Sequence, residues 1–137
     1  MDENLFAIAH LDYINSHTLI EIKGGISRET FLEIWMVSVG QRVFARSWGM
    51  KHKSWFTEFV ENHVEQIKLG DDIFNVKGQQ LLDPEMNRAV DQAYHRKYIQ
   101  KENIPYVEEI TAPKYKDFTM DFFFNPANET RVKTDKH

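Results

Sequence analysis

The chain has 137 residues, of which 42% are hydrophobic, 13% aromatic and 28% charged, with a net charge of -4 and no cysteine. This length and apolar content suit one packed domain and leave too little chain for two. The acidic balance excludes a general attraction to nucleic acids or anionic membranes, so neither is expected as a partner. Without cysteine, disulfides, thiolate catalysis and zinc-thiolate sites are excluded. The sequence contains no run of ~20 apolar residues and begins with acidic residues unlike a secretory signal, so a cytoplasmic location is expected.

The first half of the chain predicts one helix followed by strands. Residues 3–14 carry apolar and aromatic side chains at three- and four-residue steps, which predicts an amphipathic helix. Residues 18–23 (TLIEIK) have strand composition. Residues 30–39 (TFLEIWMVSV) are apolar on both faces in their second half, which predicts a central strand buried on both sides. Gly40 then opens a two-residue turn into a returning strand over residues 42–48.

The second half predicts another hairpin between two helices. Residues 54–62 form a helix capped by Ser54, and residues 64–69 and 72–77 form a hairpin around Gly70. Asp83 and Pro84 start a helix that runs to about Gln100, with Tyr94 and Tyr98 on its buried side. Residues 103–113 are predicted to be irregular, and residues 118–124 alternate as a half-buried strand. Residues 1–125 are therefore taken as one domain, and residues 126–137 as a polar, flexible tail.

The order of these elements favours a largely antiparallel sheet or barrel, because hairpins rather than crossover helices join most of the strands. Several familiar sites are missing from the sequence. It contains no P-loop, no dinucleotide-binding glycine motif and no nucleophile elbow. Its histidines are never spaced as metal ligands with carboxylate support, so no metal is expected.

The most basic window of this acidic chain runs from Arg42 to Lys53 and contains no acidic residue. If the strand leaves the sheet where predicted, Arg46 and Trp48 project from one face. The helix that begins at Ser54 would direct its free N–H groups at the same loop, which completes the components of an anion or phosphate site. The alternative is a solvated basic loop followed by a buried Trp55.

Two further residues enter as candidates. Arg28 lies in the loop after Gly24 and Gly25 and is either a further ligand of the basic site or an exposed loop arginine. Lys97 is one residue away from the stripe formed by Tyr94 and Tyr98, so its side chain can reach over the stripe toward a neighbouring pocket. Lys97 is therefore predicted to contact substrate.

The strings IWMVSVGQRVFARSW, GMKHKSWF and AYHRKY resemble the family called domain of unknown function 2255, over nearly the whole chain. The middle section is also similar, more distantly, to deazaflavin-dependent nitroreductases and to the pyridoxamine-phosphate-oxidase-like split barrels. The resemblance implies a mainly β, α+β fold: a six-stranded antiparallel split β-barrel, FMN-binding-like, with about three helices. It also implies a homodimer that binds a flavin or deazaflavin. The phosphate would be held by Arg28, Arg46, Ser47, Lys51, Lys53 and Ser54, with Trp48 near the ring.

The leading functional prediction is a flavin- or deazaflavin-dependent oxidoreductase that acts on a small acceptor, in which the cofactor carries the chemistry. One departure motivates an alternative. The deazaflavin enzymes have a Gly-Arg-Lys-Ser-Gly type of loop where this chain has Gly-Gly-Ile-Ser-Arg-Glu. The alternative is a non-enzymatic module on the same barrel that binds a small ligand or a partner without the cofactor. A barrel that binds single-stranded nucleic acid is a third and weaker option, which the net charge disfavours.

Overall fold

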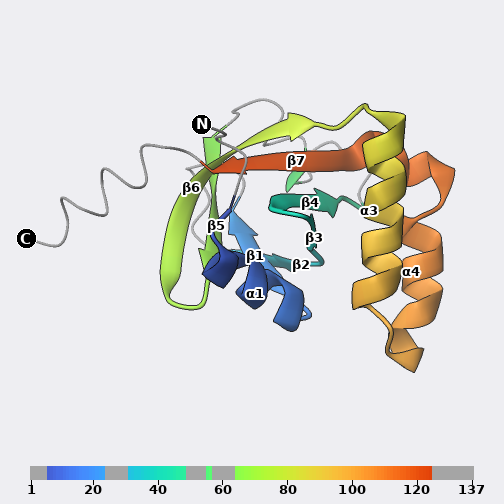
Figure 1. Ribbon diagram of the computed structural model, residues 1–137, viewed down its shortest axis with the longest axis horizontal. Helices are drawn as coiled ribbons and strands as arrows, with labels where there is room; N and C mark the ends of the chain where they lie inside the picture. The colour runs from blue at the N-terminus through green and yellow to red at the C-terminus, as the bar shows by residue number, and fades with distance from the viewer. Residues whose placement is uncertain (1–5, 24–30, 49–54, 57–63, 125–137) are drawn as a thin grey trace, which may run out of the picture.

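The computed structural model describes residues 6–23, 31–48, 55–56 and 64–124. The described helices are α1 (Ile8–Ser16), α3 (Pro84–Lys97) and α4 (Ile104–Ile110), with short 3-10 helices η1 (Lys101–Asn103) and η2 (Pro113–Phe118). The strands are β1 (Ile20–Lys23), β2 (Leu32–Ile34), β3 (Val37–Val39), β4 (Arg42–Arg46), β5 (Val64–Leu69), β6 (Asp72–Gln80) and β7 (Thr119–Phe124). Trp55 and Phe56 are also helical. Figure 1 shows α3 and α4 side by side against one end of the strands.

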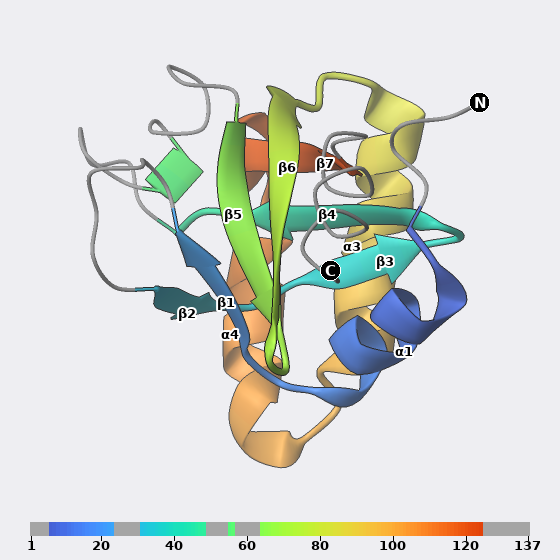
Figure 2. The ribbon, with the colours of Figure 1, turned by 90° about the vertical axis from the view of Figure 1, so that its left-hand side faces the viewer.

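All seven strands form one antiparallel sheet in the order β2-β1-β5-β6-β7-β4-β3. The edge strands β2 and β3 are consecutive in the chain, and only Trp35 and Met36 separate them. Three residue steps reach at most about 11 Å, so the sheet has to curl until its two edges lie close together. Figure 2 shows the short link from β2 to β3 passing behind β1 and β6. The result is a half-barrel, which confirms the predicted split-barrel fold with one strand more than expected.

The prediction of one central strand over residues 30–39 is wrong. This segment forms two short strands at opposite edges of the sheet. The physical reason lies at the junction, where Met36 is buried inside the barrel and Trp35 packs on the outside, against the core beneath α3 and α4. The apolar side chains on both faces of this segment therefore belong to a link that crosses from one edge of the sheet to the other.

Both predicted hairpins are confirmed. In the first, Val39 pairs with Arg42 and Gly40 has a φ of 62°. In the second, Leu69 pairs with Asp72 around Gly70, which has a φ of 67°. A positive φ at the first turn residue is the backbone conformation that tight hairpin turns require and that glycine adopts without strain.

Two hydrophobic cores lie on the two faces of the curled sheet. The inner core fills the half-barrel and includes Ile14 of α1 together with Trp55. The outer core lies between the sheet and the helices α3 and α4, and includes Tyr94 and Tyr98. Strand β4 separates the two, so it is buried on both sides. The predicted core positions of Trp55, Tyr94 and Tyr98 are confirmed.

The helix predictions are confirmed in part. Helix α1 begins later than the predicted residues 3–14, and its buried residues are Leu11 and Ile14. Residues 3–5 lie outside the described part of the chain. Helix α3 begins at Pro84, where the side chain of Asp83 accepts a hydrogen bond from Glu85 N at 3.1 Å. It ends at Lys97, three residues before the predicted end.

The prediction of an irregular segment over residues 103–113 is wrong, because α4 lies within it. Pro105 stands in the first turn, where a helix tolerates the missing N–H. Val107 and Ile110 then share one face at three-residue spacing and are buried in the outer core. None of the described helices is long and apolar enough to cross a bilayer.

Candidate functional site

Three aromatic side chains surround a hollow on the outer side of the sheet. Trp35 comes from the junction between β2 and β3, Trp48 follows the end of β4, and Tyr106 lies in the first turn of α4. With Asn103 and Glu109 they line a pocket of about 420 Å³. These five residues are called the aromatic pocket below. Tyr106 and Glu109 are three residues apart on α4, so both side chains reach the same hollow.

The three rings are held at large angles to one another. The Trp35 and Trp48 centroids are 6.3 Å apart at 64°, Trp35 and Tyr106 are 6.5 Å apart at 87°, and Trp48 and Tyr106 are 6.4 Å apart at 83°. Trp48 is 40% exposed and Tyr106 53% exposed. The rings therefore form an open corner whose walls are accessible to a ligand.

Neighbouring side chains fix the walls of this corner. One face of Trp35 is stacked on Tyr98, with centroids 4.0 Å apart and planes at 8°. Trp48 meets Tyr115 at 5.6 Å and 77°. The Tyr115 hydroxyl donates to Glu109 Oε2 at 3.3 Å. Tyr115 thus positions both an aromatic wall and the carboxylate of the pocket, which limits the reorganisation that ligand binding needs.

Lys97 does not line the aromatic pocket. Its Nζ donates to Ile14 O at 2.5 Å and to Met36 O at 2.6 Å. Burial lowers the pKa of Lys97 to about 7. The neighbouring Tyr98 hydroxyl accepts from Met36 N at 3.1 Å and donates to Thr18 O at 2.8 Å, and burial raises its pKa. Lys97 and Tyr98 thus satisfy backbone groups where the end of α3 meets α1, β1 and the strand junction.

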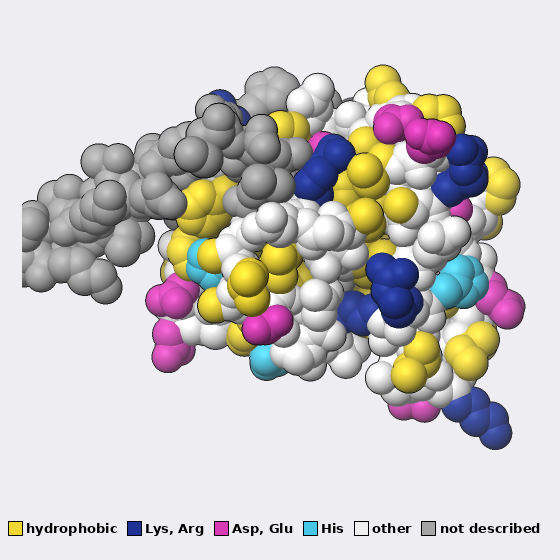
Figure 3. All heavy atoms as spheres, in the orientation of Figure 1, with side chains coloured by type: hydrophobic (Ala, Val, Ile, Leu, Met, Phe, Trp, Pro, Cys, Tyr) yellow, Lys and Arg dark blue, Asp and Glu magenta, His cyan; other side chains and the backbone are white. Residues whose placement is uncertain are grey.

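A second hollow, of about 280 Å³, is lined by Asn15, Val37, Ser38, Gly40, Ala93, Arg96 and Lys97. In Figure 3 some of the Lys and Arg side chains lie together over the later part of α3, whose last turn contains His95, Arg96 and Lys97. The predicted substrate residue Lys97 therefore borders this second hollow and not the aromatic pocket. Its two hydrogen bonds give it a structural role.

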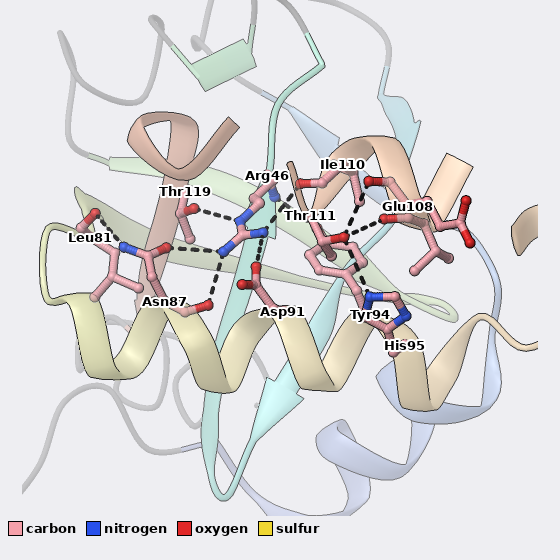
Figure 4. A network of polar contacts seen from close by, with 11 residues as sticks. Arg46, Leu81, Asn87, Asp91, Tyr94, His95, Glu108, Ile110, Thr111 and Thr119 are labelled. Carbon is pink, nitrogen blue, oxygen red and sulfur yellow. Dashed lines mark hydrogen bonds and ion pairs between the residues drawn. The ribbon is translucent and has the colours of Figure 1, made fainter. Parts of the chain in front are cut away.

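Arg46 is the centre of a buried polar network between the sheet and the helices α3 and α4 (Figure 4). It is 2% exposed. Its Nε donates to Thr119 Oγ1 at 2.8 Å, and its Nη1 donates to Asp91 Oδ1 at 2.5 Å and Ile110 O at 3.2 Å. Its Nη2 donates to Asn87 O at 3.0 Å and Asn87 Oδ1 at 3.1 Å.

These contacts use all five N–H groups that a guanidinium offers. A phosphate would have to displace protein acceptors and reach a side chain that solvent does not touch. The predicted role of Arg46 as a phosphate ligand is therefore corrected: in this structure the side chain fastens α3 and α4 to strands β4 and β7. The sequence pattern placed Arg46 on the correct face of β4 but did not reveal the helices that cover this face.

The remaining predicted ligands divide into two groups. Ser47 is 1% exposed, and its backbone N donates to Phe118 O at 3.0 Å. Trp48 lines the aromatic pocket. The other four lie outside the described residues: Arg28, Lys51, Lys53 and Ser54. Within the described part of the chain, Trp48 is thus the predicted ligand that the structure brings to a pocket.

Sequence reasoning missed Trp35, Tyr106 and Glu109. Trp35 lies in the segment predicted to be one continuous strand, and Tyr106 and Glu109 lie in the segment predicted to be irregular. The available signal was Pro105 followed by Val107 and Ile110, which marks a helix start and one buried face. Recognising α4 would have placed Tyr106 and Glu109 together.

Comparison with known proteins identifies the family. Residues 10–122 match the family described as "Uncharacterized protein conserved in bacteria (DUF2255)". The chain belongs to this family. This confirms the resemblance seen in the sequence, and its extent agrees with the single half-barrel. No curated protein matches the DUF2255 chain.

Two solved structures share the fold. The conserved hypothetical protein Rv2991 from Mycobacterium tuberculosis is 13% identical with a TM-score of 0.54, and the match covers 90% of this chain and 82% of that one. A candidate pyridoxamine 5'-phosphate oxidase from Listeria innocua is 12% identical with a TM-score of 0.52, and the match covers 85% and 89% of the two chains. At these identities the likeness establishes the fold alone.

The aromatic pocket fits a flavin poorly. A flat ring system is best held between parallel plates, whereas the walls of the aromatic pocket meet at 64° to 87°. Among the described residues, no lysine or arginine lines this pocket, and Glu109 would repel a phosphate. The described part of the chain likewise contains no cluster of three or more His, Asp or Glu side chains that could hold a metal ion.

Proposed function

We propose that this DUF2255 protein is a binding module for a small ligand, built on the split barrel, with its site in the aromatic pocket. The observation that carries the proposal is the open corner formed by Trp35, Trp48 and Tyr106 around a hollow of about 420 Å³. Volumes of this order are typical of small-molecule sites. Exposed aromatic walls that neighbouring residues hold in place suit a ligand that buries them.

A flavin- or deazaflavin-dependent oxidoreductase acting on a small acceptor is the second candidate. The fold shared with the candidate oxidase supports it, as does the presence of Trp48 at the pocket. Bound there, the cofactor would supply the hydride chemistry, and this chain would orient it and exclude water. Its phosphate ligands would have to come from Arg28, Lys51, Lys53 and Ser54, which lie outside the described residues.

Tryptophan fluorescence reports ligand binding at the aromatic pocket, because Trp35 and Trp48 line the pocket while Trp55 lies in the inner core. The choice of titrant then separates the two candidates. Compact organic ligands should change the emission of the wild-type protein and of Trp55→Phe, and should change that of Trp48→Phe less. Titrations with FMN and a deazaflavin should show no micromolar binding. A bound chromophore that absorbs between roughly 350 and 470 nm in the purified protein would instead favour the oxidoreductase.

A homodimer in the cytoplasm remains a prediction from the resemblance and the composition. The phenylalanines of β7 do not themselves argue for a dimer, because Phe122 is fully buried in the inner core and Phe124 packs against it. Phe123 is half-buried. Light scattering coupled to size exclusion measures the oligomeric state directly.

A further inference from the structure

We propose that the ligand of the aromatic pocket carries a methylated ammonium group, which sits between Trp35, Trp48 and Tyr106 with Glu109 as its counter-charge. This inference rests on the proposed binding function and names the chemical class of the ligand. Aromatic faces carry negative quadrupole charge, so several of them around one point attract a cation. The arrangement of the three rings and the charge of the lining support it independently.

The ring separations match the size of such a cation. Three perpendicular rings that face one common point are separated by √2 times the distance from that point to each centroid. Rings at separations of 6.3 to 6.5 Å whose faces turn toward one point would each have their centroid about 4.5 Å from it, inside the ~6 Å limit for cation–π attraction. One group at that point would contact all three faces at once.

The charge of the pocket lining is negative, opposite to that of the ligand. Glu109 is exposed at the pocket, and the Tyr115 hydroxyl holds its Oε2 at 3.3 Å. The other polar lining residue, Asn103, is neutral. Within the described residues no cation lines the hollow, so the ring faces and the carboxylate act together on a positive ligand.

The lining distinguishes methylated ammonium from other ligands. A primary ammonium is strongly hydrated, and the ring faces of Trp35, Trp48 and Tyr106 cannot replace that water with conventional hydrogen-bond acceptors. A methylated ammonium has fewer or no N–H groups to satisfy, and its methyl groups contact ring faces. A planar ligand can stack on only one wall of the corner at a time, since the walls are not parallel.

Calorimetric titration with choline and with 3,3-dimethyl-1-butanol, its neutral isostere, tests the charge requirement. Choline should bind the wild-type protein at least about tenfold more tightly than the alcohol, because only choline gains cation–π attraction. Equal affinity, or tighter binding of the alcohol, would overturn this inference while leaving a small-ligand site in place. Failure of both to bind would overturn the inference, and failure of every compact ligand would also overturn the proposed function.

Matched variants test which side chains cause the preference for choline over the alcohol. Glu109→Gln should weaken choline binding about fivefold or more and leave the alcohol unchanged, whereas Glu108→Gln on the exposed neighbouring position should change neither. Trp48→Leu keeps an apolar wall without a π face, so it should reduce the preference for choline. An unchanged preference in both Glu109→Gln and Trp48→Leu would contradict the site. Circular dichroism confirms that each variant is folded.

Two further titrants distinguish whether the methylated ammonium group belongs to a free small molecule or to a modified protein side chain. A short peptide with trimethyllysine presents the same group on a side chain, and glycine betaine presents it beside a carboxylate. Choline binding more tightly than the peptide supports a free small molecule, and the reverse supports a modified side chain with the same chemistry. Glycine betaine should bind more weakly than choline, because its carboxylate approaches Glu109.

Discussion

Lys97 Nζ donates a hydrogen bond to Met36 O at 2.6 Å and so connects the last residue of α3 to the point where β2 passes into β3. This is where the two edges of the sheet meet, and the chain there has left one ladder without having entered the other. Its backbone groups need partners from elsewhere. The Tyr98 hydroxyl supplies the partner for Met36 N. The end of α3 thus stabilises the closure of the half-barrel.

Replacing Lys97 by methionine removes both hydrogen bonds, so Ile14 O loses its Lys97 donor and Met36 O keeps the longer contact from the Tyr98 hydroxyl at 3.4 Å. At pH 9, Lys97→Met should lower the free energy of unfolding by about 1–3 kcal/mol, because unsatisfied buried acceptors are costly. Lys101→Met, at an exposed position, should change it by less than about 0.5 kcal/mol. Urea titrations of the two variants provide the comparison, and equal stability would contradict the structural role of Lys97.

The same lysine predicts a dependence on pH. Burial lowers its pKa in the folded protein from 10.5 to about 7. Between these values the unfolded chain binds the additional proton, so this group makes the protein more stable as pH rises from about 7 to 10.5. The difference in unfolding free energy between wild type and Lys97→Met should therefore grow between pH 7 and pH 9.5. A difference that shrinks with pH would show that burial does not destabilise the protonated form of Lys97.

Arg46→Lys tests the assignment of Arg46 to the fold. A lysine cannot satisfy the acceptors on Asp91, Asn87, Thr119 and Ile110 together, so stability should fall by about 3–5 kcal/mol. Arg88→Lys, at an exposed position of α3, should stay within about 0.5 kcal/mol of wild type. Thermal melts would show the contrast. Unchanged stability together with lost binding of FMN would restore the phosphate role.

Gly40 offers a test of the first hairpin. Its φ of 62° is unfavourable for residues with a side chain, although open space surrounds the position where a Cβ would stand. Gly40→Ala should therefore cost about 1–2 kcal/mol from backbone strain alone. Gly40→Asn should cost less, because asparagine tolerates this conformation. If alanine and asparagine had the same effect in chemical denaturation, strain at this φ would not be the cause.

Local patterns in the sequence determined the elements that depend on near neighbours. Glycine at the first turn position identified both hairpins, and Asp83 with Pro84 identified the start of α3, because turns and caps are set by the residues within them. The stripe of Tyr94 and Tyr98 likewise identified a buried helix face. Family resemblance, more than periodicity, supplied the split barrel.

Tertiary structure alone decided where those elements lie relative to one another. The segment over residues 30–39 could be recognised as extended, but its division between two sheet edges follows from the pairing of β2 with β1 and of β3 with β4. Similarly, Arg46 could be placed on a face of β4, but only the packing of α3 and α4 showed that acceptors occupy all of its N–H groups.

The candidate site likewise contains one residue that the sequence selected and others that only the structure revealed. The sequence alone selected Trp48 as a functional aromatic residue, and the structure places it in the aromatic pocket. Its partners come from other elements: Trp35 from the junction between β2 and β3, and Tyr106 and Glu109 from α4. Local propensity carries no information about such distances, because they arise when the sheet curls and α4 packs beside its outer face.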